Sequence, residues 1–169
     1  MIISLLGYMG SGKSHISKVL SQKLNLPVID LDDEIILSNH MPIAEIFDKK
    51  GEIFFRREEK RILTELLALE KDFILSFGGG TPAYYDNIEL INKKSTSIYL
   101  RSNIGTLTAR LKKQKAKRPL LAKIPDDDLP EFIAKHLFER QPFYAAAKFT
   151  VTTDGKKPSE VAEQIADLL

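Results

Sequence analysis

The segment with the clearest chemistry is residues 7–14, which read GYMGSGKS and match the phosphate-loop pattern GxxxxGK[ST] at every fixed position. It follows an apolar run of strand length, residues 2–6, as a phosphate loop does. Glycines let main-chain amides approach phosphate oxygens, and the following helix directs its N-terminal amides at them. Lys13 would reach the β and γ phosphates, and Ser14 would ligate Mg²⁺. The segment therefore predicts nucleoside triphosphate binding, in preference to a glycine-rich turn without a ligand.

Four carboxylates lie within five residues after the expected second strand: Asp30, Asp32, Asp33 and Glu34. Alternate residues of an extended strand share a face, so Asp30 and Asp32 would both face the nucleotide, and the other two would face solvent. One carboxylate could hold the water ligands of Mg²⁺, and a second could orient a substrate hydroxyl and accept its proton. The alternative is an acidic helix N-terminus, which the helix dipole favours without any function.

Arg56 is the arginine best suited to bind a carboxylate. In a helix beginning near Gly51, Arg56 and Glu59 would be neighbours one turn apart, and such a pair can fix the direction of the guanidinium. A guanidinium held in this way forms a bidentate clamp that lysine cannot reproduce. The surrounding charged residues are interpreted instead as a solvated helix face; these are Arg57, Glu58, Lys60 and Arg61.

Three consecutive glycines, residues 78–80, follow the apolar run 73–77. Main chain without Cβ atoms allows a ligand to approach closely. Because ligands bind at the ends of the strands in an open α/β sheet, binding is favoured over a flexible turn before Thr81 and Pro82.

Residues 110–123 carry seven basic side chains and no acidic one. The segment has no aromatic residue for base stacking, so a mobile cationic lid over ATP is favoured over a nucleic-acid patch. Arg118, directly before Pro119, is placed to contact the transferred phosphate. Further on, Pro142 is expected to end a helix, which places Arg140 at a helix C-terminus, where an arginine is favourable even without a ligand.

These residues require a scaffold in which strands and helices alternate. Amphipathic helical spacing is found at residues 15–24, around residues 62–69 and in a C-terminal helix that opens at Pro158. The alternation predicts an α/β fold with a five-stranded parallel sheet covered on both faces. The expected strands are residues 2–6, 27–29, 73–77, 97–100 and 149–152.

Composition indicates one compact domain. The chain has 169 residues, 43% of them hydrophobic, and a net charge of +2 that does not suggest nucleic-acid binding. There is no cysteine, hence no disulfide or thiolate site. The absence of a basic leader and of a long apolar stretch predicts a cytoplasmic protein that does not contact membranes. No segment shows a surplus apolar face, so a monomer is expected.

Taken together and in order, the motifs resemble the shikimate kinase family over nearly the whole chain. They are the phosphate loop, DLD at 30–32, GEIFFRREE at 51–59, GGG at 78–80, RPLL at 118–121, RQPFY at 140–144 and DGKKP at 154–158. The resemblance implies the fold of the nucleoside monophosphate kinases, with a substrate-binding segment at about 31–61 and a lid at about 111–125. It also implies Mg²⁺-dependent transfer of the ATP γ-phosphoryl group to the 3-hydroxyl of shikimate, giving ADP and shikimate 3-phosphate, in aromatic amino acid biosynthesis.

The resemblance also implies a role for each matching residue. Catalysis would rest on Lys13, Asp32 and Arg118. Mg²⁺ would be held by Ser14 and Asp30. ATP would contact Gly10, Ser11, Gly12, Lys13, Ser14, His15, Arg118 and Lys156. Shikimate would contact Asp32, Arg56, Gly78, Gly79, Gly80 and Arg140.

The sequence departs from the family pattern at His15, where threonine is common, and at Phe143, where leucine is common. Two other functions are compatible with the phosphate loop. One is a kinase of another small molecule, such as gluconate or a nucleotide, which would not need two arginines for one carboxylate. The other is a nucleotide-binding regulator without turnover, which would be expected to have lost Lys13, Asp32 or Arg118.

Overall fold

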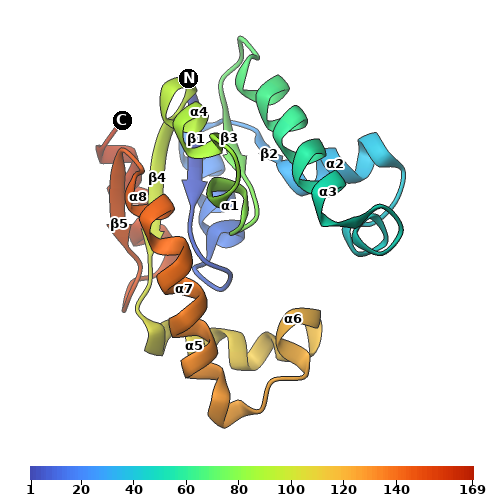
Figure 1. Ribbon diagram of the computed structural model, residues 1–169. Coiled ribbons are helices and arrows are strands. Elements are labelled where there is room, and N and C mark those ends of the chain that lie inside the picture. The colour runs from blue at the N-terminus through green and yellow to red at the C-terminus, as the bar shows by residue number, and fades with distance from the viewer.

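The computed structural model describes residues 1–169 and contains a single five-stranded sheet. All neighbouring strands are parallel, and their order is β2-β3-β1-β4-β5 (Figure 1). The five predicted strands are confirmed, with ends that differ by at most one residue. Their bounds are β1 Ile2–Leu6, β2 Val28–Asp30, β3 Phe73–Ser76, β4 Thr96–Arg101 and β5 Phe149–Thr152.

Eight α-helices connect and cover the strands. They are α1 Lys13–Leu24, α2 Leu31–Asn39, α3 Ile43–Leu67, α4 Asn87–Lys94, α5 Ile104–Gln114, α6 Pro119–Ala122, α7 Leu129–Ala145 and α8 Pro158–Asp167. Three short 3-10 helices lie at Thr81–Ala83, Lys115–Lys117 and Asp126–Asp128. No helix combines the length and the apolar character needed to cross a membrane.

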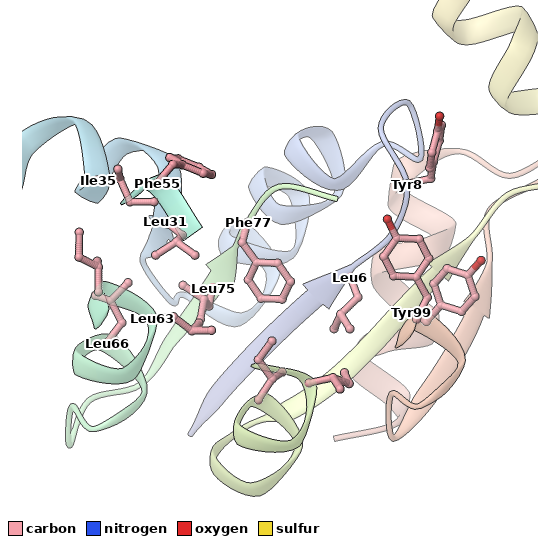
Figure 2. Packing of buried hydrophobic residues seen from close by; sticks show 14 of the residues in the cluster. Leu6, Tyr8, Leu31, Ile35, Phe55, Leu63, Leu66, Leu75, Phe77 and Tyr99 are labelled. Atoms are coloured by element: carbon pink, nitrogen blue, oxygen red, sulfur yellow. The ribbon is translucent and has the colours of Figure 1, made fainter. Parts of the chain in front are cut away.

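The helices form a layer on each face of the sheet, as predicted. Successive residues of a strand point to opposite faces, so Ile3 and Leu5 of β1 pack with α1 and α8, whereas Ile2 and Leu6 pack on the other side. That second side holds the larger cluster, which includes residues of α2, α3, α4, α5 and α7. Figure 2 shows its centre around Leu6, Leu75 and Phe77. Both faces of the sheet are therefore buried.

Helix α3 is bent at Gly51, whose φ of 85° and ψ of 170° are not helical. The expected helix that begins near this glycine is thus the second part of a longer one, preceded by a part that starts at Ile43. Figure 1 shows α2 and α3 at the β2 edge of the sheet and α6 beyond the end of α5.

Two local predictions are wrong. Asp30 and Asp32 were expected on one face of an extended strand, but β2 ends at Asp30 and α2 begins at Leu31. The acidic residues therefore form a helix N-terminus. Pro142 does not end a helix, because α7 continues to Ala145 and leaves Arg140 inside it. A proline inside a helix removes its own N–H from the hydrogen bonds and crowds the carbonyl of the residue four positions earlier. The burial of Tyr144 holds the last turn in place despite this cost.

Candidate active site

The phosphate loop joins β1 to α1 at the carboxyl end of the sheet. Gly12, the N-cap of α1, has φ 92°, a left-handed conformation that glycine adopts without strain. The loop curls around the side chain of Lys13, whose ammonium donates hydrogen bonds to the carbonyl oxygens of Gly7 at 2.5 Å and Tyr8 at 3.1 Å. The lysine is thus held at the mouth of the loop.

The charge of Lys13 is not fully compensated by these contacts. Burial, together with the positive charge of Arg118, lowers its pKa to about 7, and the acidic groups of Asp32 and Asp30 oppose this effect. A cation in this environment gains most from an anion placed beside it. The loop is therefore prepared electrostatically for phosphate.

A cleft of about 720 Å³ opens above the loop. It brings together residues from β1–α1, β2–α2, the segment after β3, the lid region and the segment after β5. Among the predicted site residues, those that line it are Gly10, Ser11, Gly12, Lys13, Ser14, His15, Asp30, Asp32, Gly78, Gly79, Arg118 and Lys156.

Asp30 and Asp32 occupy different environments at the start of α2. Asp30 is the N-cap and accepts hydrogen bonds from the main-chain N–H groups of Asp32 at 2.9 Å and Asp33 at 3.2 Å. The carboxylate of Asp32 makes no such contact. Burial first, and then the negative charges of Asp30 and Glu59, raise its pKa to about 6. Asp32 is therefore the carboxylate in the cleft that is free to accept a proton.

The donor set in the cleft is compatible with Mg²⁺. Ser14 offers a hydroxyl oxygen, and Asp30 and Asp32 offer carboxylate oxygens, which are the ligands that this hard cation prefers. No three acidic, histidine or cysteine side chains gather closely enough to hold a metal ion alone. Mg²⁺ is commonly bound through one or two carboxylates together with substrate phosphates, and the residues fit that mode.

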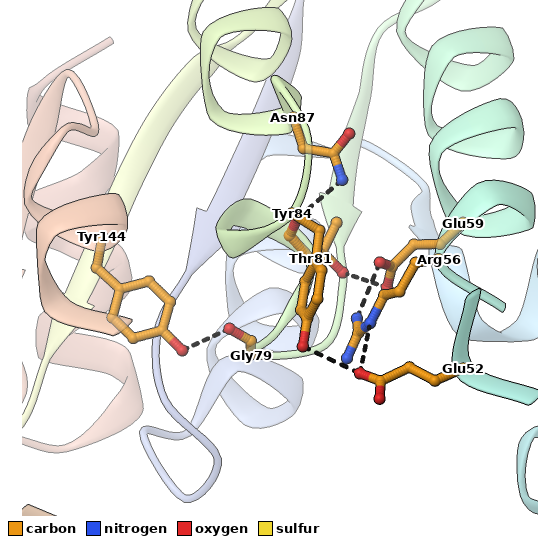
Figure 3. A network of polar contacts seen from close by, with 8 residues as sticks. All are labelled: Glu52, Arg56, Glu59, Gly79, Thr81, Tyr84, Asn87 and Tyr144. Atoms are coloured by element: carbon orange, nitrogen blue, oxygen red, sulfur yellow. Dashed lines mark hydrogen bonds and ion pairs between the residues drawn. The ribbon is translucent and has the colours of Figure 1, made fainter. Parts of the chain in front are cut away.

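Arg56 is held in the polar network shown in Figure 3. Its guanidinium donates a hydrogen bond to Glu59 at 2.9 Å, which confirms the predicted pairing one turn apart. Glu59 is 1% exposed and also accepts a hydrogen bond from Thr81 at 2.8 Å. A second carboxylate, that of Glu52, lies 3.8 Å from Nε of Arg56. The residue is therefore held by one hydrogen bond, to Glu59, with a second carboxylate nearby.

Three predicted substrate residues do not line the main cleft: Arg56, Gly80 and Arg140. Gly80 lies against the guanidinium of Arg56, and Arg56 borders a second cavity of about 450 Å³. Arg140 is half-buried on α7, and its positive charge opposes the burial that raises the pKa of Tyr144 to about 12. Arg56 belongs to α3 and Arg140 to α7, and Figure 3 shows Gly79 between Arg56 of the first helix and Tyr144 of the second.

The lid region predicted at 111–125 comprises the end of α5, a 3-10 helix and α6. Leu111 and Leu121 are buried and anchor it, and Lys115 pairs with Asp126 at 2.9 Å. Arg118 donates two hydrogen bonds to Gln114, from Nε at 3.2 Å and from a terminal nitrogen at 2.9 Å. The arginine that faces the cleft is therefore steadied from the preceding helix.

Sequence reasoning missed several residues of the site. Arg110 lines the cleft and donates a hydrogen bond to the carbonyl oxygen of Gly10 at 3.2 Å, and Gln114 holds Arg118. Arg110 and Gln114 are four residues apart and therefore share one face of α5, a signal present in the sequence. The sequence did not predict the partners of Tyr8 and Tyr144, two buried residues beside the site, because these partners come from distant segments: Oη of Tyr8 lies 2.9 Å from Nδ1 of His136, and the hydroxyl of Tyr144 donates to the carbonyl oxygen of Gly79.

The parallel sheet, the glycine loop between β1 and α1, and a half-buried lysine that shares a cleft with two carboxylates define the class of phosphate-loop kinases. Comparison with known proteins defines the family. A model described as shikimate kinase matches residues 9–169. A shikimate kinase of Flavobacterium psychrophilum is 45% identical over 168 residues, covering 99% of this chain and 98% of that protein. The chain belongs to the shikimate kinase family.

Solved structures agree. The crystal structure of a shikimate kinase from Bacteroides thetaiotaomicron superimposes with a TM-score of 0.91 at 35% identity, covering 99% of this chain and 97% of the other. A shikimate kinase from Acinetobacter baumannii, solved in complex with shikimate, gives 0.86 at 28% identity, covering 99% and 91%. The chain is thus a kinase of the shikimate pathway that uses ATP, and neither a kinase of another class nor a regulator without turnover is supported.

Proposed function

We propose that the chain catalyses Mg²⁺-dependent transfer of the ATP γ-phosphoryl group to the 3-hydroxyl of shikimate, and that the residues of the cleft have the following roles. The observation that carries the proposal is the convergence of Lys13, Asp32 and Arg118 on one cleft beside the phosphate loop. Phosphoryl transfer needs positioning and neutralisation of charge more than covalent participation of the protein. These three side chains provide both.

On the nucleotide side, loop amides of residues 10–14 surround the phosphates, and Lys13 contacts the β and γ groups. His15 and Lys156 border the same cleft and would contact ATP, as would Arg118. Ser14 and Asp30 would hold Mg²⁺, which neutralises charge on the phosphates when bound. Arg118, fixed by Gln114, would contact the transferred group.

On the acceptor side, Asp32 would orient the 3-hydroxyl and accept its proton. A Cβ built on Gly78 would lie 3.8 Å from the carboxylate of Asp32, so the triglycine segment borders the place where this hydroxyl must lie. The missing side chain of Gly78 leaves room for the ring beside Asp32, whereas the side-chain position of Gly79, which also lines the cleft, is taken by the hydroxyl of Tyr144. The pKa of Asp32, about 6, leaves it ionised at neutral pH yet more basic than an ordinary aspartate.

Arg56 and Arg140 would bind the carboxylate of shikimate. Both are partly buried arginines, and a guanidinium pairs with a carboxylate through two parallel hydrogen bonds. The contact with Glu59 uses one terminal nitrogen of Arg56 and leaves the other without a hydrogen bond inside the protein.

We further propose a single domain and a monomer in the cytoplasm, in which residues 31–61 form the substrate-binding segment and residues 111–125 form a lid. Residues 31–61 contribute Asp32 and Arg56, and residues 111–125 contribute Arg118, which supports this division. Sedimentation with and without both substrates tests the monomer, and a smaller hydrodynamic radius with both bound would support lid closure.

ADP release with Mg²⁺ and ATP tests the reaction. Shikimate, gluconate, a nucleoside monophosphate and no acceptor are compared in parallel. Turnover with shikimate alone, with the product phosphorylated at the 3-hydroxyl by NMR, supports the proposal. Phosphorylation at another hydroxyl would contradict the placement of Asp32, and turnover without Mg²⁺ would contradict the metal site.

A further inference from the structure

Tyr84 lies against the guanidinium of Arg56. The central carbon of the guanidinium is 3.9 Å from the centre of the Tyr84 ring, a close cation–π contact. Arg56 also lies 5.1 Å from the ring of its neighbour Phe55. Phe55 lies on α3, the same helix as Arg56, whereas Tyr84 lies in the segment that follows the triglycine motif.

The Tyr84 ring is itself held in place. Its hydroxyl donates a hydrogen bond to Glu52 at 3.1 Å, and the same carboxylate oxygen of Glu52 lies 3.8 Å from Nε of Arg56 (Figure 3). The main chain before Tyr84 is fixed by Asn87, which is fully buried and donates a hydrogen bond to the carbonyl oxygen of Thr81 at 2.9 Å. The ring is therefore placed before any substrate arrives.

Few other groups fix the plane of the guanidinium. Glu59 takes one terminal nitrogen at 2.9 Å, while Nε of Arg56 is buried and has no hydrogen-bond partner. One hydrogen bond leaves the guanidinium free to rotate about the bond, whereas an aromatic ring at stacking distance restrains the plane. Orientation of the plane matters because bidentate binding of a carboxylate requires both donors to point at it.

We propose that Tyr84 is a positioning residue for shikimate binding, which sets the plane of the Arg56 guanidinium through its ring. The inference rests on the proposed role of Arg56 in binding the substrate carboxylate. Tyr84, in the segment after the triglycine motif, would thus contribute to the affinity for shikimate without contacting the reacting atoms. The hydroxyl of Tyr84 serves to hold Glu52 and is secondary to the ring.

Steady-state kinetics of Tyr84→Leu and Tyr84→Phe tests the proposal. Tyr84→Leu is expected to raise the KM for shikimate about three- to ten-fold, because the cation–π contact is lost, with kcat and the KM for ATP within about two-fold of the parent. Tyr84→Phe keeps the ring and is expected to restore the KM for shikimate to within about two-fold. Tyr85→Leu is the matched control, since its side chain is 54% exposed and faces Lys60 instead of Arg56.

A double variant separates positioning from general damage to the fold. In an Arg56→Ala background, Tyr84→Leu is expected to cause no further loss of kcat/KM for shikimate, because the group that it positions is gone. Circular dichroism and thermal unfolding of each variant show whether the fold is retained. Additive losses in the double variant would overturn the proposal, as would a loss in Tyr84→Phe equal to that in Tyr84→Leu.

Failure of the inference is distinguishable from failure of the role given to Arg56. If Arg56→Ala leaves the KM for shikimate unchanged, the arginine does not bind substrate and both statements are wrong. If Arg56→Ala raises the KM but Tyr84→Leu does not, the substrate role of Arg56 stands and only the positioning role of Tyr84 is refuted.

Discussion

The guanidinium of Arg56 occupies the space in which a side chain on Gly80 would lie. A Cβ built on Gly80 would be 2.8 Å from one terminal nitrogen of Arg56 and 3.0 Å from the other. The main chain at Gly80 has φ −83° and ψ −24°, which any residue can adopt. Glycine is therefore required at this position by the approach of the arginine and not by the backbone conformation.

Gly80→Ala is expected to displace Arg56 while leaving the fold intact. The atoms in the way are the end of a flexible side chain, but Glu59 is buried and would lose part of its contact with Arg56, so the free energy of unfolding should fall by about 1–3 kcal/mol. The KM for shikimate should rise roughly ten-fold, because the clamp loses its geometry. Substrate titrations and thermal unfolding measure the two effects. Gly105→Ala, in the first turn of α5, is the control and should leave the KM unchanged, with a stability equal to or slightly above that of the parent; an unaltered KM in Gly80→Ala would contradict the clamp.

Asp32→Asn is expected to lower kcat by about 10²-fold or more with little change in ATP binding, because the amide cannot accept the hydroxyl proton. In the parent enzyme, kcat/KM for shikimate should fall as the pH drops through about 6, where the Asp32 carboxylate takes up a proton. A pH profile and calorimetric titration of ATP measure both. A variant that turns over normally would remove Asp32 from the mechanism.

The same substitution should stabilise the protein at neutral pH. The pKa of Asp32 is about 6 in the folded chain against an ordinary value of 3.8, so the folded state binds this proton more tightly than the unfolded state. The ionised residue therefore costs stability above pH 6, and the cost disappears below about pH 4. Chemical denaturation should show Asp32→Asn to be more stable at pH 7.5 by roughly 1 kcal/mol, and no more stable at pH 4, if the fold persists there.

ATP binding is expected to take up a proton above pH 7. The pKa of Lys13 is about 7 without nucleotide, and phosphate anions beside the ammonium should raise it. At pH 8, titration calorimetry in buffers of different ionisation enthalpy should therefore show uptake approaching about one proton per ATP, with affinity that weakens as the pH rises. Lys13→Met should abolish the uptake. Equal heats in all buffers would place the pKa of Lys13 well away from 7.

Arg118→Ala should reduce kcat by about 10²-fold or more if the guanidinium contacts the transferred phosphate. Gln114→Ala, which removes the acceptor of both Arg118 hydrogen bonds, should give a smaller loss in the same direction. Lys117→Ala, an exposed neighbour, serves as the control for loss of bulk positive charge. Equal losses in the Lys117 and Arg118 variants would indicate a general field effect in place of a specific contact.

The sequence by itself determined the elements and the chemistry of the nucleotide side. The phosphate loop is local: eight consecutive residues contain the glycines, the lysine and the hydroxyl, so their order alone places them together. Alternation of apolar strands and amphipathic helices likewise predicted the parallel sheet, and the spacing of Arg56 and Glu59 predicted their contact. Local physical rules were sufficient for each of these.

Where local preferences conflicted, the tertiary structure decided. The acidic run at residues 30–34 was compatible with a strand or a helix N-terminus, and the start of α2 settled this by placing Asp30 at the N-cap. Proline at 142 predicted a helix end, but α7 continues because Tyr144 is buried and its hydroxyl donates a hydrogen bond to the carbonyl oxygen of Gly79, which together offset the lost hydrogen bond and the steric cost of the proline. Tertiary contacts, which combine burial of a large side chain with a hydrogen bond, are strong enough to override local preference at this position.

Only the tertiary structure decided the contacts between distant segments. Tyr84 against Arg56, Gly80 beneath the same guanidinium, and the Tyr144 hydroxyl on the carbonyl oxygen of Gly79 at 2.5 Å join residues from separate elements. Such pairs depend on how helices lie against the sheet, and no periodicity along the chain records that arrangement. The pKa values of Lys13 and Asp32 also depend on the tertiary structure, because burial and the charges of neighbouring elements set them.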